Sequence, residues 1–185
     1  MLAMIRFGTP FVGALGFCLA VSALGMQALA EPDQTTTLAE LAGSYEYAGD
    51  RAKDEAAIKA QSDVATAGMG RMTLKRALPR LESSTRIPES LSITLQGDEV
   101  TFKMDDHTVK VPKDGSSAAT TTEFGETADL SFDIETATLL QSVAKTGGKK
   151  TNAFRFNEAG QLVMQVRVTN SKLAAPVVFS ARYAK

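Results

Sequence analysis

The sequence predicts a mainly β protein: an antiparallel up-and-down barrel or half-barrel of about 8–10 strands, with a helix-turn-helix inserted after the first strand. From residue 91 onward apolar and polar side chains alternate, as they do in strands that bury one face and expose the other. Tight turns containing Gly, Asn and Asp separate these strands, and no segment between them is long enough for a crossover helix. Successive strands are therefore expected to pair as an antiparallel meander.

The first strand and two helical segments precede this alternating region. Tyr45 and Tyr47 share one face of a short strand. A helical lid is predicted over about 50–82, where Asp50 is a good N-cap and Gly68 ends the first of the two helices. Because the apolar face of that helix consists mainly of alanines, it buries little surface, and the lid is expected to lie shallowly on the barrel.

Residues 1–30 have the pattern of a cleaved signal peptide. A short basic start precedes an apolar run at 11–24, and Ala28 and Ala30 are the small residues that signal peptidase recognises. The apolar run is shorter than the ~20 residues that span a bilayer, which argues against an uncleaved anchor. The sequence therefore predicts cleavage after Ala30 and a periplasmic or secreted protein.

The remaining chain has the composition of one domain. Residues 31–40 are polar and rich in threonine, which predicts a flexible leader, and 41–185 have the length of a single barrel domain. Cys18 is the only cysteine, so the exported chain would contain neither a disulfide nor a sulfur ligand for a metal. The formal net charge of the full sequence, −1, argues against nucleic acid as a partner, and a monomer is expected.

Short motifs accompany this order of elements. Residues 41–45 (LAGSY) open the first strand, 68–70 (GMG) join the two helices, 181–183 (ARY) lie in the last strand, and Arg155 precedes a turn. Together they resemble the fatty-acid-binding-protein branch of the lipocalin-like (calycin) superfamily. The resemblance implies a barrel that holds a small apolar ligand, with interior arginines that bind its carboxylate.

Arg155 and Arg182 stand where the resemblance implies these anion contacts. Strand parity gives a different prediction, because both arginines face outward if Phe154 and Tyr183 face inward. A buried arginine without a partner is destabilising, which favours solvated wall positions over an interior anion site. The sequence leaves both interpretations open.

The alternating pattern also predicts a cavity. A closed barrel of about ten strands is wider than the eight-stranded size that side chains fill, which leaves room for a ligand. The predicted lining is Phe102, Met104, Phe132, Phe154, Leu162, Met164, Phe179 and Tyr183. The alternative is that the same residues pack into a solid core.

The second helical segment has a basic face formed by Arg71, Lys75 and Arg76. Cations over a barrel mouth would attract anionic lipid headgroups, at roughly 1 kcal/mol for each well-placed charge. An anionic membrane surface is therefore a predicted partner, and a solvated helix face is the alternative.

The sequence shows no catalytic or metal-binding constellation. His107 follows Asp105 and Asp106, which are too few convergent groups for a metal or acid–base site, and no cofactor motif occurs. The predicted function is that of an exported non-enzymatic binding protein for a small apolar or amphipathic ligand such as a lipid or fatty acid. The alternative is an exported protein-interaction module, an enzyme inhibitor or envelope assembly factor, with a packed barrel and no ligand.

Overall fold

A computed structural model gives the structure of the protein and describes residues 34–185, except for 123 and 136. The predicted signal peptide at 1–30 and the cleavage after Ala30 lie outside the described residues. No helix within the described part of the chain is long and apolar enough to cross a membrane.

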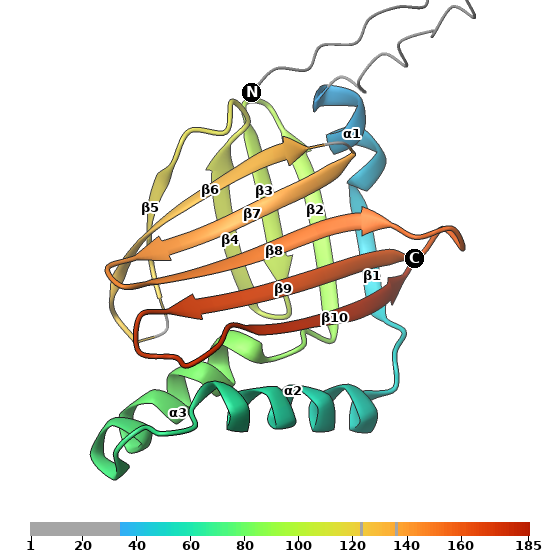
Figure 1. Cartoon of the computed structure of the whole chain (residues 1–185). Coiled ribbons are helices and arrows are strands. Elements are labelled where there is room, and N and C mark those ends of the chain that lie inside the picture. Colours follow the sequence, from blue (N-terminus) through green and yellow to red (C-terminus); the bar gives the residue numbers. More distant parts are fainter. Residues whose placement is uncertain (1–33, 123, 136) are drawn as a thin grey trace, which may run out of the picture. The chain divides into compact units, whose positions relative to one another are not determined.

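Ten antiparallel strands form one sheet in the described part of the chain, and three helices accompany it (Figure 1). The elements are α1 (Gln34–Leu41), β1 (Gly43–Tyr47), α2 (Arg51–Ala65), α3 (Arg71–Thr85), β2 (Ser90–Gln96), β3 (Glu99–Met104), β4 (His107–Pro112), β5 (Ala118–Thr121), β6 (Thr127–Glu135), β7 (Thr138–Lys145), β8 (Gly148–Phe156), β9 (Leu162–Asn170) and β10 (Val177–Ala184). The strand order is β4-β3-β2-β1-β10-β9-β8-β7-β6-β5, and the edge strands β4 and β5 approach each other to give a nearly closed barrel. The predicted mainly β barrel is confirmed.

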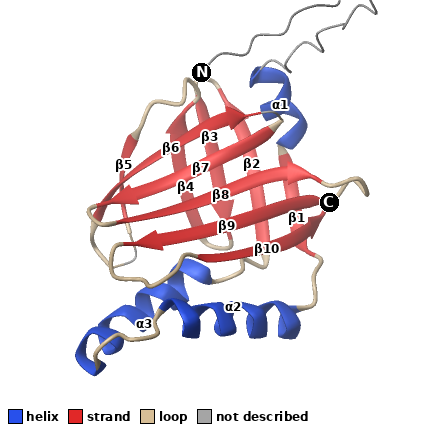
Figure 2. Cartoon of the chain, in the orientation of Figure 1, coloured by secondary structure: helices blue, strands red, loops and turns tan. Residues whose placement is uncertain are grey.

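Two helices lie between β1 and β2, as the sequence predicts, and both lie at one end of the barrel (Figure 2). Asp50 caps α2 by accepting a hydrogen bond from the Lys53 amide at 3.1 Å. Gly68, with a φ of +82°, takes a left-handed conformation in the loop that separates α2 from α3. The predicted lid over about 50–82 corresponds to this helix pair, which extends to Thr85.

The register of β6 to β10 places the inward side chains in successive rows. We call the row deepest in the barrel the floor row, and it contains Ile134, Leu139, Phe154, Met164 and Ala181. The next, the middle row, contains Phe132, Gln141, Asn152, Val166 and Phe179. The mouth row, nearest the lid, contains Leu130, Val143, Lys150, Val168 and Val177. The floor row is therefore entirely apolar, whereas the two rows nearer the lid contain an amide pair and a lysine.

The half of the barrel away from the lid is filled by a hydrophobic core. The rings of Phe102 and Phe154 stack across it with their centroids 5.9 Å apart and their planes at 23°. Tyr183 is also fully buried, but near the lid, where its hydroxyl donates a hydrogen bond at 3.2 Å to the carbonyl of Pro88, between α3 and β2. Burial raises the pKa of this tyrosine, so the hydroxyl remains protonated and available as a donor.

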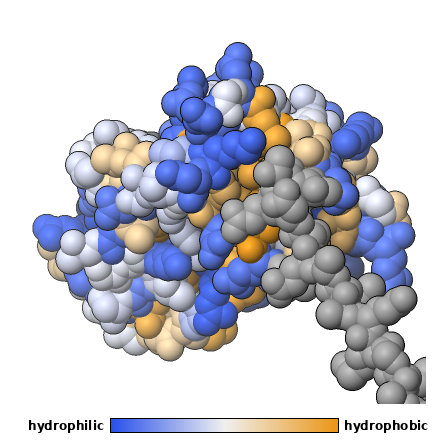
Figure 3. Space-filling view, turned by 90° about the horizontal axis from the view of Figure 1, so that it is seen from above, coloured by the Kyte–Doolittle hydropathy of each residue, from blue (hydrophilic) through white to orange (hydrophobic). Residues whose placement is uncertain are grey.

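Helix α1 lies at the opposite end of the barrel from α2 and α3 (Figure 1). Leu38 and Leu41 are each 1% exposed and belong to the core, and the Tyr45 hydroxyl donates to the Leu41 carbonyl at 2.8 Å. The predicted flexible leader over 31–40 is therefore wrong from Gln34 onward, because these leucines anchor a helix in the core. Figure 3 looks onto this end and shows a narrow strip of apolar residues among hydrophilic ones.

Candidate ligand-binding cavity

A cavity of about 1240 Å³ lies between α3 and the strand ends that face it. Its apolar surface includes Met104, Val109, Leu130, Val143 and Val168, whereas the floor-row side chains do not line it. The interior is thus divided along the barrel axis into a packed half and a hollow half next to the lid. Filling one end while leaving the other hollow gives a pocket with a rigid base.

A pair of amides lies in the wall of this cavity. Asn152 Nδ2 donates a hydrogen bond of 2.7 Å to Gln141 Oε1 across the β7–β8 pair, and the two residues are 2% and 1% exposed. Among the described residues, Gln141 Nε2 and Asn152 Oδ1 have no hydrogen-bond partner in the protein. The wall therefore presents one unused donor and one unused acceptor.

This amide pair is absent from the lining predicted from the sequence. In β7, Gln141 stands two positions from Leu139 and from Val143, so strand parity turns it to the inner face. In β8, Asn152 stands two positions before Phe154 and faces the same way. The signal for this pair in the sequence is a polar residue at an inward strand position. The predicted lining consists of apolar and aromatic side chains, so it does not include the two amides.

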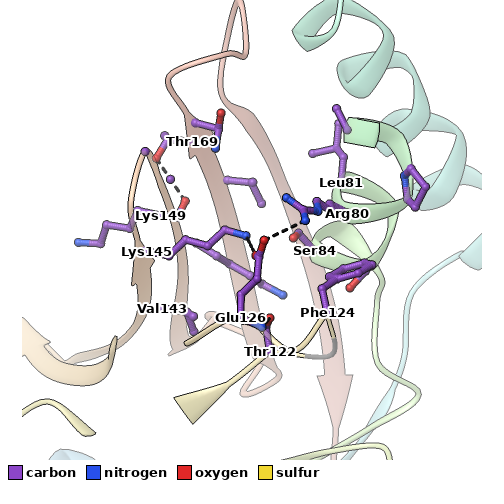
Figure 4. A pocket seen from close by; sticks show the side chains of 18 of the residues that line it. Arg80, Leu81, Ser84, Thr122, Phe124, Glu126, Val143, Lys145, Lys149 and Thr169 are labelled. Carbon is purple, nitrogen blue, oxygen red and sulfur yellow. Dashed lines mark hydrogen bonds and ion pairs between the residues drawn. The ribbon is translucent and has the colours of Figure 1, made fainter. Parts of the chain in front are cut away.

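Glu126 is held at the mouth of the cavity between two cations (Figure 4). Its Oε1 lies 2.9 Å from Arg80 Nη2 on α3, and its Oε2 pairs with Lys145 Nζ at the end of β7. The hydrogen bond from Lys145 lowers the pKa of the Glu126 carboxyl below the usual 4.5, and Arg80 contributes in the same direction. We call these three residues the Glu126 network. It ties the lid to the barrel wall across the mouth.

The two lid helices are attached differently. The α2 helix is fixed to the last strand and to the loop before it, since the Val178 amide of β10 donates to Gln61 Oε1 and the Ala174 amide of the β9–β10 loop donates to the Ala65 carbonyl, both at 2.8 Å. Each helix buries two side chains and leaves one large apolar residue exposed, Val64 on α2 and Met72 on α3. For α3, the helix over the cavity, the Glu126 network contributes the ion pairs that hold it to the barrel wall.

We expect Glu126→Gln to loosen α3 without unfolding the barrel. The neutral amide removes both ion pairs, so hydrogen exchange of the α3 amides should accelerate by roughly threefold, while the exchange of β8 stays unchanged. Glu99→Gln is the matched control, because Glu99 pairs with Lys110 on the β3–β4 hairpin away from the lid. Equal acceleration in both variants would contradict a closing role for the network.

The same network predicts a pH dependence. Because the pKa of Glu126 is lowered in the folded protein, its contribution to closure is fully present above the usual value of 4.5. The contribution is lost as the pH falls further, through the lowered pKa, where the carboxylate is protonated and both ion pairs break. Exchange of the α3 amides should therefore accelerate in that acidic window in the wild-type protein, and this step should be absent from Glu126→Gln.

The predicted lining residues are distributed unequally between the two halves of the barrel. Met104 lines the cavity. The other seven do not, because they are buried in the hydrophobic core: Phe102, Phe132, Phe154, Leu162, Met164, Phe179 and Tyr183. The inner face thus lines a cavity in one part of the barrel and forms a packed core in the other.

The predicted charged contacts lie outside the interior. Arg155 and Arg182 are exposed and do not line the cavity, so an interior anion contact through them is wrong, and strand parity explains why. Arg71, Lys75 and Arg76 are exposed on α3, and the last two also border the cavity. Their contact with an anionic membrane surface stays a prediction.

Neither a protein-family model nor a curated protein sequence matches this chain. Among solved structures, the fluorescent protein UnaG N57A mutant is similar with a TM-score of 0.50 and 15% identity, covering 80% of this chain and 97% of that chain. Lipid binding protein 8 of Caenorhabditis elegans is 11% identical with a TM-score of 0.49, covering 80% and 96% of the two chains. The fatty acid binding protein of Schistosoma mansoni in complex with arachidonic acid is 12% identical with a TM-score of 0.47, covering 80% and 99%.

The similarity to these solved structures is a similarity of fold. The shared fold, in the described part of this chain, is a nearly closed barrel of ten antiparallel strands with two helices between β1 and β2. The predicted resemblance is thereby confirmed as a likeness of fold alone, and the function has to be argued from the cavity.

Proposed function

We propose that this protein is a non-enzymatic binding protein for a small amphipathic molecule of the lipid or fatty-acid class. The observation that carries the proposal is the cavity of about 1240 Å³ beneath α3. Ligand pockets in proteins are concave, mainly apolar and lined by a few placed polar groups. The cavity has this composition, with aliphatic walls and a buried amide pair.

The charges at the mouth favour a ligand with an anionic end. The cationic residues that border the cavity are Lys75, Arg76, Arg80, Arg86, Lys145, Lys149, Lys150 and Lys172. Asp105 and Glu126 are the acidic residues among the described lining. This excess of positive charge attracts an anionic headgroup to the mouth, while the apolar body occupies the aliphatic walls below it.

The proposal includes export of the protein. It is supported by the sequence of residues 1–30, whose apolar run and Ala28-Leu29-Ala30 site are typical of a cleaved signal peptide. A carrier of apolar molecules outside the cytoplasm needs a site shielded from water, and α3 covers part of this cavity.

The test is uptake of a fluorescent fatty acid by the purified, delipidated protein. We expect saturable binding at micromolar concentrations, with displacement of the probe by unlabelled oleic acid. Binding should weaken as the salt concentration rises, because the headgroup meets the cationic mouth. Absence of saturable binding would overturn the proposal and favour the protein-interaction module.

A further inference from the structure

The two amides in the cavity wall point to a second polar feature of the ligand. Gln141 and Asn152 are almost completely buried, and each has one side-chain atom without a partner among the described residues. Buried polar groups in folded proteins are nearly always hydrogen-bonded. Resting on the proposed function, we propose that these residues bind a neutral hydroxyl or amide group carried part-way along the apolar body of the ligand.

The choice of a donor–acceptor group follows from the chemistry of an amide pair. With Asn152 Nδ2 donating to Gln141 Oε1, the unused atoms are the donor Gln141 Nε2 and the acceptor Asn152 Oδ1. Exchanging the oxygen and nitrogen positions of both amides reverses the bond, yet it again leaves one donor and one acceptor. A hydroxyl both donates and accepts, so it satisfies either arrangement.

A charged group is disfavoured at this depth. An ionised carboxylate only accepts hydrogen bonds and would be repelled by the unused amide oxygen. The neighbouring inward residues of the middle row, Phe132, Val166 and Phe179, are buried and apolar, so they offer no solvation to an anion. The anionic end of the ligand is better placed near Lys145 at the mouth.

The strand geometry sets the spacing between the two polar groups of the ligand. Gln141 and Lys145 lie on the same inward side of β7, four residues apart. At about 3.3 Å per residue, the backbone positions of Gln141 and Lys145 are about 13 Å apart. A hydroxyl near the middle of an extended long-chain fatty acid lies at a comparable distance from its carboxylate.

The experiment compares oleic acid with ricinoleic acid, which carries a hydroxyl in the middle of its chain. We expect the wild-type protein to bind ricinoleic acid roughly tenfold more tightly, as measured by competition with the fluorescent probe. In the double variant Gln141→Leu/Asn152→Leu this preference should fall below roughly twofold, while oleic acid still binds, because removing both amides leaves a continuous apolar wall.

Gln165→Leu is the matched control, since Gln165 lies exposed on the outer face of β9 and should keep the preference. Thermal unfolding of each variant establishes that it is folded. Equal affinities of the wild-type protein for the two acids, or a preference that survives in the double variant, would overturn this inference and leave the proposed function standing. Failure of both acids to bind would overturn the two together.

Discussion

Replacing Phe154 by alanine is expected to destabilise the protein by about 3–5 kcal/mol. Phe154 is fully buried in the floor row, and its ring stacks on that of Phe102 with the centroids 5.9 Å apart. Removing it leaves a void that the surrounding walls of a hydrogen-bonded barrel close only in part. Urea unfolding of the wild-type and variant proteins measures the difference, and the melting temperature should fall by about 6–20 °C.

The adjacent Arg155 provides the control for this substitution. It is exposed on the outer face, so Arg155→Ala should change the free energy of unfolding by less than roughly 0.5 kcal/mol. It should also leave fatty-acid binding unchanged, because the side chain does not line the cavity. Similar losses of stability in the two variants would show that the register of β8 is wrong.

The alternation of side chains predicts the barrel because each strand exposes one face and buries the other. Phe102, Phe132 and Met164 are assigned to the inner face by their sequence neighbours alone, and all three are buried. The same parity places Arg155 and Arg182 outside, against the implication of the resemblance. Local sequence thus determines the side of the sheet on which a residue lies.

Local sequence does not determine how deep in the barrel a residue lies. Phe154 and Lys150 share the inner face of β8, yet one is packed in the floor row and the other borders the cavity. Depth depends on the stagger of neighbouring strands and on which end the helices cover. For the same reason the sequence predicts a lining for the cavity but not its position beneath α3.

The predicted flexible leader at 31–40 shows a second reason why a prediction from sequence can be wrong. The threonine-rich composition of 31–40 is typical of a flexible segment, but Leu38 and Leu41 find apolar partners in the core at the end of the barrel away from the lid. Such partners come from strands distant in sequence, so no pattern within the segment reveals them. Tertiary packing then overrides the local preference.

Narrowing the cavity is expected to weaken ligand binding without harming the fold. Val143 lies in the mouth row, is half-buried and lines the cavity. The larger ring of Val143→Phe would project into space that the ligand body occupies, so we expect the affinity for the fluorescent fatty acid to fall by at least roughly tenfold. The free energy of unfolding should stay the same or increase, because the ring gains apolar contacts in a site with room for it.

Val163→Phe supplies the matched control on the outer face of β9. Val163 pairs with the exposed Arg155 and Arg182, so the same change of side chain occurs there on the side of the sheet away from the cavity. Binding should then be unchanged, whereas a general effect of adding a ring to the barrel would weaken binding in both variants. If Val143→Phe binds the probe as tightly as the wild-type protein does, the fatty acid occupies a surface elsewhere, and the cavity beneath α3 is not the binding site.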